Sequence, residues 1–82
     1  MTIVVLTPER EIYQGNITSV KVPGITGKFE VLQNHAPIVA ALGTGEVRII
    51  DAQGATKKFN IQKGFIEVLR NEVSLLVQGV TE

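Results

Sequence analysis

A chain of 82 residues has room for one domain, 1–82, and its eight basic and eight acidic residues give a formal net charge of zero. No basic stripe is visible that could neutralise nucleic-acid phosphates, so the balance disfavours nucleic-acid binding. The absence of cysteine excludes disulfide bonds and thiolate metal sites, and the N-terminal apolar run is too short for a signal peptide or a membrane span. We expect a soluble, intracellular protein.

The chain is predicted to consist of short β-strands, because apolar residues recur with a spacing of two rather than 3.6. Val20 and Val22, for example, flank Lys21. Residues 37–42 could be read as a short helix, but β-branched members and a following glycine favour a strand. In chain order, the expected strands lie at 2–6, around 20–22, and at 37–42, 46–49, 57–62, 65–69 and 73–77.

Turn-forming residues separate these runs, and Asn71 in the last turn is able to adopt a positive φ. Reversals every eight to twelve residues or so are typical of an antiparallel sandwich or barrel, so the predicted class is all-β. Residues 79–82 are expected to fray. The expected reversals are at Gly15-Asn16, Pro23-Gly24, 51–54, 62–64 and 70–72.

No set of residues with catalytic, cofactor-binding or metal-binding spacing is found. His35 is the only histidine, and Pro37 restricts Ala36 to an extended conformation, so we expect the imidazole at the entrance to a strand, packing or bonding a backbone carbonyl. The glycines open no phosphate-binding helix. Lys57-Lys58 is interpreted as one inward and one outward side chain. The aromatic residues are interpreted as core or core-edge positions: Tyr13, Phe29, Phe59 and Phe65.

The order of several short motifs resembles the N-terminal β-sandwich domain of the ATP synthase epsilon subunit, which is called delta in mitochondria. The resemblance covers nearly the whole chain. Its motifs are Leu6-Thr7-Pro8-Glu9, Gly15, Val22-Pro23-Gly24, Gly27-x-Phe29-x-Val31-Leu32, His35-Ala36-Pro37, Leu42-x-x-Gly45-x-Val47, residues 63–68, Asn71 and residues 73–76.

The resemblance implies a flattened β-sandwich of about ten short strands and a role without chemistry of its own. Such a domain sits in the central stalk, turns with the gamma subunit and the membrane rotor (c) ring, and couples ion flow to ATP synthesis, peripheral to the cytoplasmic face of the membrane. By resemblance, Thr7, His35 and Ala40 face gamma. The resemblance likewise implies that the bend at 24–28, with Ile25, Thr26, Gly27 and Lys28, faces the rotor ring.

The residues themselves are compatible with that role. Ile25 between two glycines is poorly explained by solvation, and Ala36, Ala40 and Ala41 allow another chain to approach closely, although core packing explains these alanines equally well.

Four positions depart from the family pattern. Glu30 and the pair Gln33-Asn34 stand where many members have glycine and Pro-Gly, so Asn34 must make its bend differently. Lys28 replaces an acidic residue found in some relatives, which puts any specific ion pair with the ring in doubt.

Family members commonly continue into a C-terminal helical hairpin that restrains ATP hydrolysis and in some bacteria binds ATP. Because this sequence stops at Glu82, neither property is expected of it; a truncated piece would look the same. Two other functions remain open. A lipoyl or biotinyl carrier would need a lysine at a hairpin tip, which the tips near Gln53-Gly54 and Asn71 lack. A small OB-like nucleic-acid binder is disfavoured by the zero net charge.

Overall fold

The computed structural model describes all residues, 1–82, and contains eight β-strands and no helix. The prediction of an all-β fold is therefore confirmed. The strands are β1 (Thr2–Leu6), β2 (Glu11–Gly24), β3 (Gly27–Leu32), β4 (Ile38–Leu42), β5 (Gly45–Asp51), β6 (Thr56–Ile61), β7 (Lys63–Leu69) and β8 (Glu72–Gln78).

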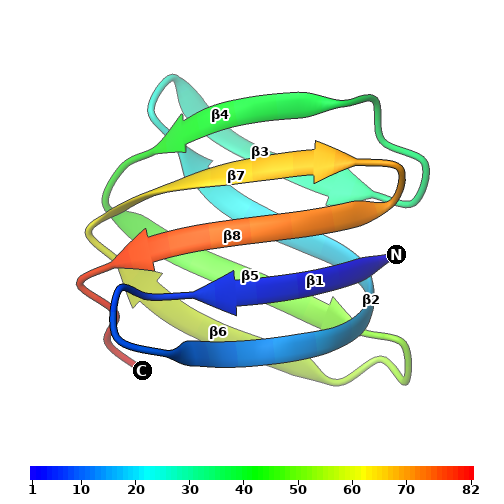
Figure 1. Ribbon diagram of the computed structural model, residues 1–82, viewed down its shortest axis with the longest axis horizontal. Coiled ribbons are helices and arrows are strands. Elements are labelled where there is room, and N and C mark those ends of the chain that lie inside the picture. Colours follow the sequence, from blue (N-terminus) through cyan, green and yellow to red (C-terminus); the bar gives the residue numbers. More distant parts are fainter.

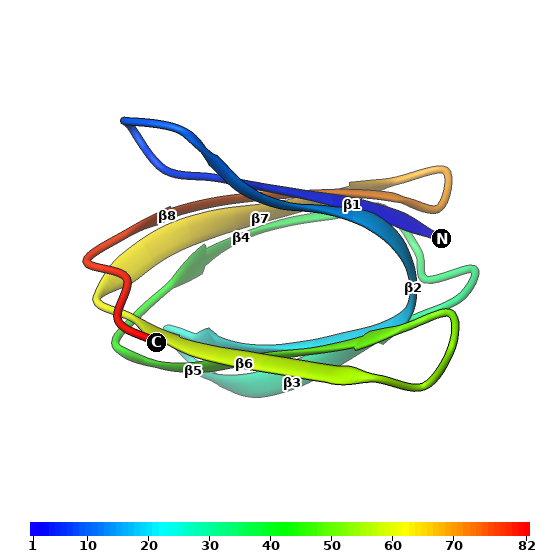
Figure 2. The same cartoon turned by 90° about the horizontal axis from the view of Figure 1, so that it is seen from below.

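The strands form two layers that face each other across the core (Figures 1 and 2). The front layer holds β4, β7, β8, β1 and the first part of β2, and the back layer holds β3, the second part of β2, β5 and β6. Neighbouring strands are antiparallel with one exception: β1 runs parallel to β8, with Thr2 opposite Glu72 and Leu6 opposite Leu76. The sandwich is thus mixed at one strand pair rather than purely antiparallel.

Strand β2 belongs to both layers, so one strand takes the place of two, and the structure has eight strands where about ten are expected. A reversal is expected at Gly15-Asn16, but the strand continues: it pairs with β1 as far as Asn16 and with β5 from Ile17 onward. The register shifts between Ile17 and Ser19, which marks a bulge. Bends and bulges are the usual means by which one strand passes between packed sheets, and Figure 2 shows β2 turning this corner.

The tail after β8 is held in place rather than frayed. The Asn60 N–H donates to the Thr81 carbonyl at 2.8 Å, and the Thr81 N–H donates back at 2.9 Å. One residue further, Lys57 Nζ lies 2.9 Å from a carboxylate oxygen of Glu82. Lys57 is half-buried and Lys58 is exposed, which confirms the inward and outward interpretation of this pair. The tail therefore covers part of the open edge of β6.

The core contains 16 buried apolar side chains, contributed by alternate positions of both layers. Phe59 is its largest member, whereas Tyr13 and Phe29 pack at its border. The expectation that Phe65 is also a core or core-edge residue is wrong: its side chain is 58% exposed, because the neighbouring Ile66 takes the inward position on β7.

Two loops at one end of the sandwich are joined by asparagines. Arg70 and Asn71 both have positive φ, 51° and 62°, and connect β7 to β8 as a two-residue turn of the I′ type. Asn34 has a φ of 65°, so it makes its bend in the left-handed conformation, as the sequence requires. The Asn34 N–H donates to Asn71 Oδ1 at 2.6 Å, and Asn71 Nδ2 donates to Asn34 Oδ1 at 3.0 Å.

Candidate interaction surfaces

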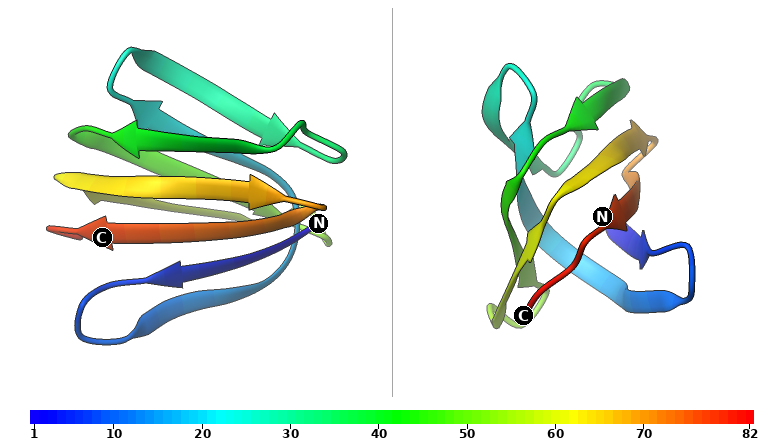
Figure 3. Two further views of the ribbon diagram at one scale, coloured as in Figure 1. Left: turned by 45° about the horizontal axis from the view of Figure 1, so that its top comes forward. Right: turned by 90° about the vertical axis from the view of Figure 1, so that its left-hand side faces the viewer.

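The outer face of the front layer carries a row of apolar side chains at matched positions on four strands. Ala41 lies opposite Phe65, Phe65 opposite Leu76, and Leu76 opposite Leu6. Figure 3 (left) shows these strands, β4, β7, β8 and β1, lying side by side in that order. Phe65 is 58% and Leu76 50% exposed, so the row is open to solvent.

This row lines an apolar groove of about 660 Å³. The Ile25 N–H donates to the Ala41 carbonyl at 3.1 Å, which places the bend between β2 and β3 beside the groove, and Ile25 is 68% exposed. The groove and its margin, which we call the front surface, are formed by Leu6, Thr7, Ile25, Ala41, Lys63, Phe65 and Leu76. Exposed apolar side chains gathered in one row make this surface a candidate protein–protein contact site.

The front surface is absent from the sequence predictions, although the sequence contains one signal for it. Glu67 interrupts the apolar run at 65–69, and a charged side chain does not point into the core. Because side chains alternate along a strand, Glu67 places its second neighbours Phe65 and Leu69 on the outward face. Ile66 and Val68 are then assigned to the core, and both are buried in the structure.

The three residues predicted to face gamma do not lie together. Strands β1, β4 and β8 run in one direction, so Thr7, which follows β1, and His35, which precedes β4, are at opposite ends of the front layer. Ala40 lies on β4 opposite the buried Ile66 and packs against the core. The outer face of β4 is formed by its neighbours Val39 and Ala41, and Val39 is 71% exposed.

The polar groups of Thr7 and His35 are engaged locally. Thr7 Oγ1 donates to the Arg10 carbonyl at 3.0 Å and accepts from the Arg10 N–H at 3.1 Å, which holds the loop between β1 and β2. His35 Nδ1 lies 2.7 Å from the Ala36 carbonyl. Because a carbonyl oxygen only accepts, this contact places the ring proton on Nδ1. His35 is half-buried and bonds a backbone carbonyl, as expected from its position before Pro37.

The bend at 24–28, predicted to face a rotor ring, lies at the same end as Thr7. Its shape requires both glycines. Gly27 has a φ of 140°, and a Cβ on Gly24 would lie 2.6 Å from the Gly27 carbonyl oxygen and 2.9 Å from the Phe29 ring. Ile25, Thr26, Gly27 and Lys28 are all exposed. The bend therefore presents an apolar and a cationic side chain on a backbone of fixed shape.

One carboxyl group has a clearly shifted pKa. The hydrogen bond and the positive charge of Lys57 lower the pKa of Glu82, with a smaller contribution from Arg10.

No group of three or more histidine, aspartate or glutamate side chains converges in a way that could hold a metal ion. The chain has no helix long and apolar enough to cross a membrane. A lipoyl or biotinyl carrier would need a lysine at a hairpin tip. Lys63 is not at such a tip, because it begins β7.

The strands and layers define the chain as a small β-sandwich domain with an exposed apolar row on one outer face. The family model described as ATP synthase delta/epsilon chain, beta-sandwich domain, matches residues 1–82, so the chain belongs to this family. The recognition made from the sequence motifs is confirmed.

Individual relatives and solved structures agree with this assignment. The chain is 40% identical over 80 residues to the ATP synthase epsilon chain of Chlorobaculum tepidum, covering 98% of this chain and 91% of that one. It is 42% identical to that of Leptospira borgpetersenii, covering 93% of this chain but 59% of the relative. Its fold matches a chain of the Euglena gracilis mitochondrial ATP synthase with a TM-score of 0.89 at 18% identity, over 96% of this chain and 51% of that chain.

Proposed function

We propose that the chain is a non-catalytic subunit of the central stalk of an F-type ATP synthase, which joins the gamma subunit to the membrane rotor ring and so helps couple ion translocation to ATP synthesis. The observation that carries the proposal is the front surface, together with membership of the family. In this role the protein is peripheral to the membrane and needs no cofactor.

The front surface is the proposed gamma-binding site. Phe65 and Leu76 expose apolar area that no part of this chain covers, and burial under a partner removes that area from water. Aromatic side chains near the centre of such a patch often dominate binding. Thr7 lines the same groove, which supports its assignment to the gamma side; His35 and Ala40 remain predictions from the family resemblance.

The bend at 24–28 is the proposed contact with the rotor ring. It lies at one end of the sandwich and adjoins the groove through Ile25, so gamma and the ring would meet the domain at neighbouring surfaces. A solved structure with the same fold, at 15% identity and a TM-score of 0.82, comes from the central stalk and c-ring of the Tetrahymena thermophila mitochondrial ATP synthase. That likeness supports the fold, and the ring contact is our proposal.

The gamma-binding proposal is tested by Phe65→Arg in co-purification with the gamma subunit of the same organism. The substitution places a charge on an outward position and leaves the core intact, so we expect a folded domain that binds gamma at least about tenfold more weakly. Ala40→Arg is less informative, because Ala40 packs against the core. Gln53→Arg, at the exposed tip between β5 and β6, is the control. Retention of wild-type binding by both Phe65→Arg and Leu76→Arg would remove the front surface from the interface.

A further inference from the structure

A row of charged side chains crosses the outer face of the back layer. Glu30 on β3 lies opposite Lys21 on β2, Lys21 opposite Arg48 on β5, and Arg48 opposite Lys58 on β6. These positions are far apart in the sequence, and only strand pairing brings them together. We call this set the back row. It lies on the layer that does not carry the front surface.

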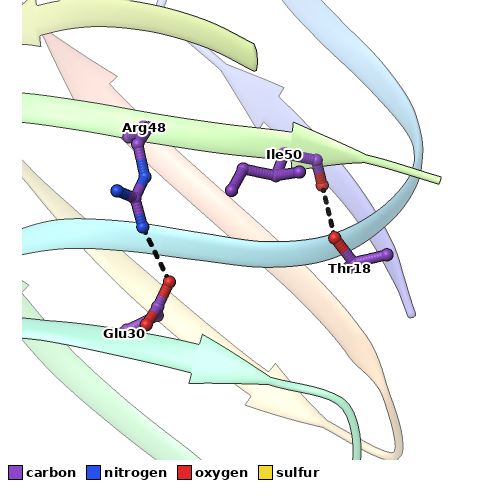
Figure 4. A network of polar contacts seen from close by, with 4 residues as sticks. All are labelled: Thr18, Glu30, Arg48 and Ile50. Atoms are coloured by element: carbon purple, nitrogen blue, oxygen red, sulfur yellow. Dashed lines mark hydrogen bonds and ion pairs between the residues drawn. The ribbon is translucent and has the colours of Figure 1, made fainter. Parts of the chain in front are cut away.

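The back row has three cations and one carboxylate, and its charges are incompletely paired. Arg48 Nη2 reaches across β2 to Glu30 Oε2 at 2.8 Å (Figure 4). The only other ion pair in the chain joins Lys57 to Glu82, so Lys21 and Lys58 have no acidic partner. Like charges directly opposite each other on neighbouring strands destabilise a sheet. The free protein therefore carries an unfavourable cluster that an added carboxylate would relieve.

Arg48 also has unused hydrogen-bonding capacity. Its Nε is buried and has no partner, and its bond to Glu30 uses a single nitrogen. Carboxylates bind arginine best through two parallel bonds, and a buried donor without a partner is unfavourable. Nε is shielded from solvent and Nη2 is already bonded to Glu30, so an incoming carboxylate would be bound by the other N–H groups of the Arg48 guanidinium, whose side chain is 32% exposed.

An apolar row lies directly beside the charged one. Leu32 and Ile50 flank Ser19 on the same outer face, and Leu32 is 53% exposed. Ser19 is 4% exposed, and its hydroxyl has no hydrogen-bond partner. The Thr18 hydroxyl next to it is already bonded to the Ile50 carbonyl (Figure 4). The face thus combines cations with exposed hydrocarbon, which suits an amphipathic ligand.

We propose that the back row binds an acidic segment of a protein partner, at a surface separate from those that bind gamma and the rotor ring. Strands are about 4.8 Å apart, so Lys21 and Lys58, two strands apart, stand about 10 Å from each other. Glutamates three residues apart in a polyproline II segment lie on one side of it, about 9 Å apart, and match that separation. Apolar residues of the segment contact Leu32 and Ile50.

Two other anionic partners fit less well. A membrane surface is bound by clusters of about four to eight basic residues, and the back row has three. Nucleic-acid binding of useful strength likewise requires more phosphate contacts than three cations provide. A protein segment combines carboxylates with hydrocarbon, as this face does.

The proposal is tested by NMR titration of the isotope-labelled chain with a short synthetic peptide that has glutamates three residues apart among prolines and leucines. We expect shifts of the Lys21, Arg48 and Lys58 amides that weaken with added salt. Lys21→Glu and Lys58→Glu are each expected to weaken binding about tenfold. Lys58→Glu also places a carboxylate opposite Arg48, so it should raise the melting temperature while it lowers peptide affinity. A higher melting temperature together with weaker peptide binding would show that Lys58→Glu is folded and has lost only the binding surface.

Arg70→Glu makes the same charge change in the turn between β7 and β8 and serves as the control, with affinity expected to stay within about twofold of wild type. The proposal is overturned if the peptide causes no shifts, or if Arg70→Glu weakens binding as much as Lys58→Glu. It is equally overturned if phosphatidylglycerol-containing vesicles or a single-stranded oligonucleotide shift the same amides at lower concentration than the peptide does.

Discussion

At the residue scale, Asn34 and Asn71 show how a side chain can fix a backbone that is otherwise unfavourable. Each has a positive φ, and each hydrogen-bonds the other across two loops. Asparagine tolerates the left-handed conformation better than other non-glycine residues, and here it adds bonds that glycine could not make. The N–H of Thr2 also donates to the Asn71 carbonyl, so three segments of the chain meet at this residue.

Asn71→Ala is predicted to destabilise the domain by about 2 kcal/mol, because it removes hydrogen bonds and leaves alanine in a strained conformation. Asn71→Gly removes the same side-chain bonds without the strain and should cost about half as much. Urea unfolding of the two variants measures the difference. If both unfold at the wild-type midpoint, the asparagine pair contributes nothing to stability.

The pair formed by Lys57 and Glu82 makes stability depend on acid pH. Lys57 lowers the pKa of Glu82 in the folded chain, so the stabilisation is complete above the ordinary pKa of glutamate and is lost as the pH falls through the lowered value. In Lys57→Met, the pKa of Glu82 should return toward its ordinary value. NMR titration of the Glu82 carboxyl measures this, and the same pKa in both proteins would contradict it.

At the element scale, the approach of β7 to β8 depends on Gly64. A Cβ at this position would collide with the Leu76 carbonyl oxygen and come within 3.1 Å of Val77 Cγ1. A Cβ on Gly43, in contrast, would project into open space with no atom within 4 Å, and neither glycine has a positive φ. The two glycines therefore form a matched comparison of a crowded and an open site.

Gly64→Ala is predicted to destabilise the domain by about 1–3 kcal/mol through steric conflict with β8. Because Leu76 lies in the front surface, the same change should also weaken gamma binding. Gly43→Ala should be neutral or slightly stabilising, since alanine restricts the unfolded chain. Thermal unfolding of both variants is the measurement, and equal melting temperatures would show that β8 shifts to accept the methyl group.

The elements differ in how far the sequence predicts them. Alternation identifies the strands at 46–49 and 57–62, because their outward positions are polar. The register shift that marks the corner lies between Ile17 and Ser19, just after Gly15-Asn16, and one sequence does not distinguish a reversal from a corner. The outcome depends on whether β2 finds β1 as a partner before this point and β5 after it. Both pairings depend on the tertiary structure rather than on the local sequence.

At the scale of the whole molecule, the sandwich separates its surfaces by chemistry. The front surface is largely apolar, the back row is cationic, and the bend at 24–28 closes one end between them. The front surface is partly predictable from the position of Glu67. The back row is not, because Lys21, Arg48 and Lys58 are separated along the chain and their alignment depends on the register of three strands. The net charge of zero gives no indication that cations are grouped on one face.

This separation predicts that the proposed contacts can be disrupted one at a time. Lys28→Glu, at the end of the bend, should weaken association with the rotor ring and leave gamma binding unchanged, because Lys28 does not line the groove. Phe65→Arg should mainly weaken gamma binding. Reconstitution with purified gamma and with detergent-solubilised rotor ring measures the two separately. Equal loss of both contacts in Lys28→Glu would mean that the surfaces are not independent.

The parallel pairing of β1 with β8 has a consequence for synthesis of the chain. Strand β1 acquires β8 as its second neighbour only after the chain as far as Glu72 and beyond has been synthesised, since Thr2 pairs with Glu72. Until then one edge of β1 is an open template for strand addition. A β8 strand supplied by a second copy would satisfy the same edge, so we expect exchange of β8 to be the route by which this fold forms domain-swapped dimers.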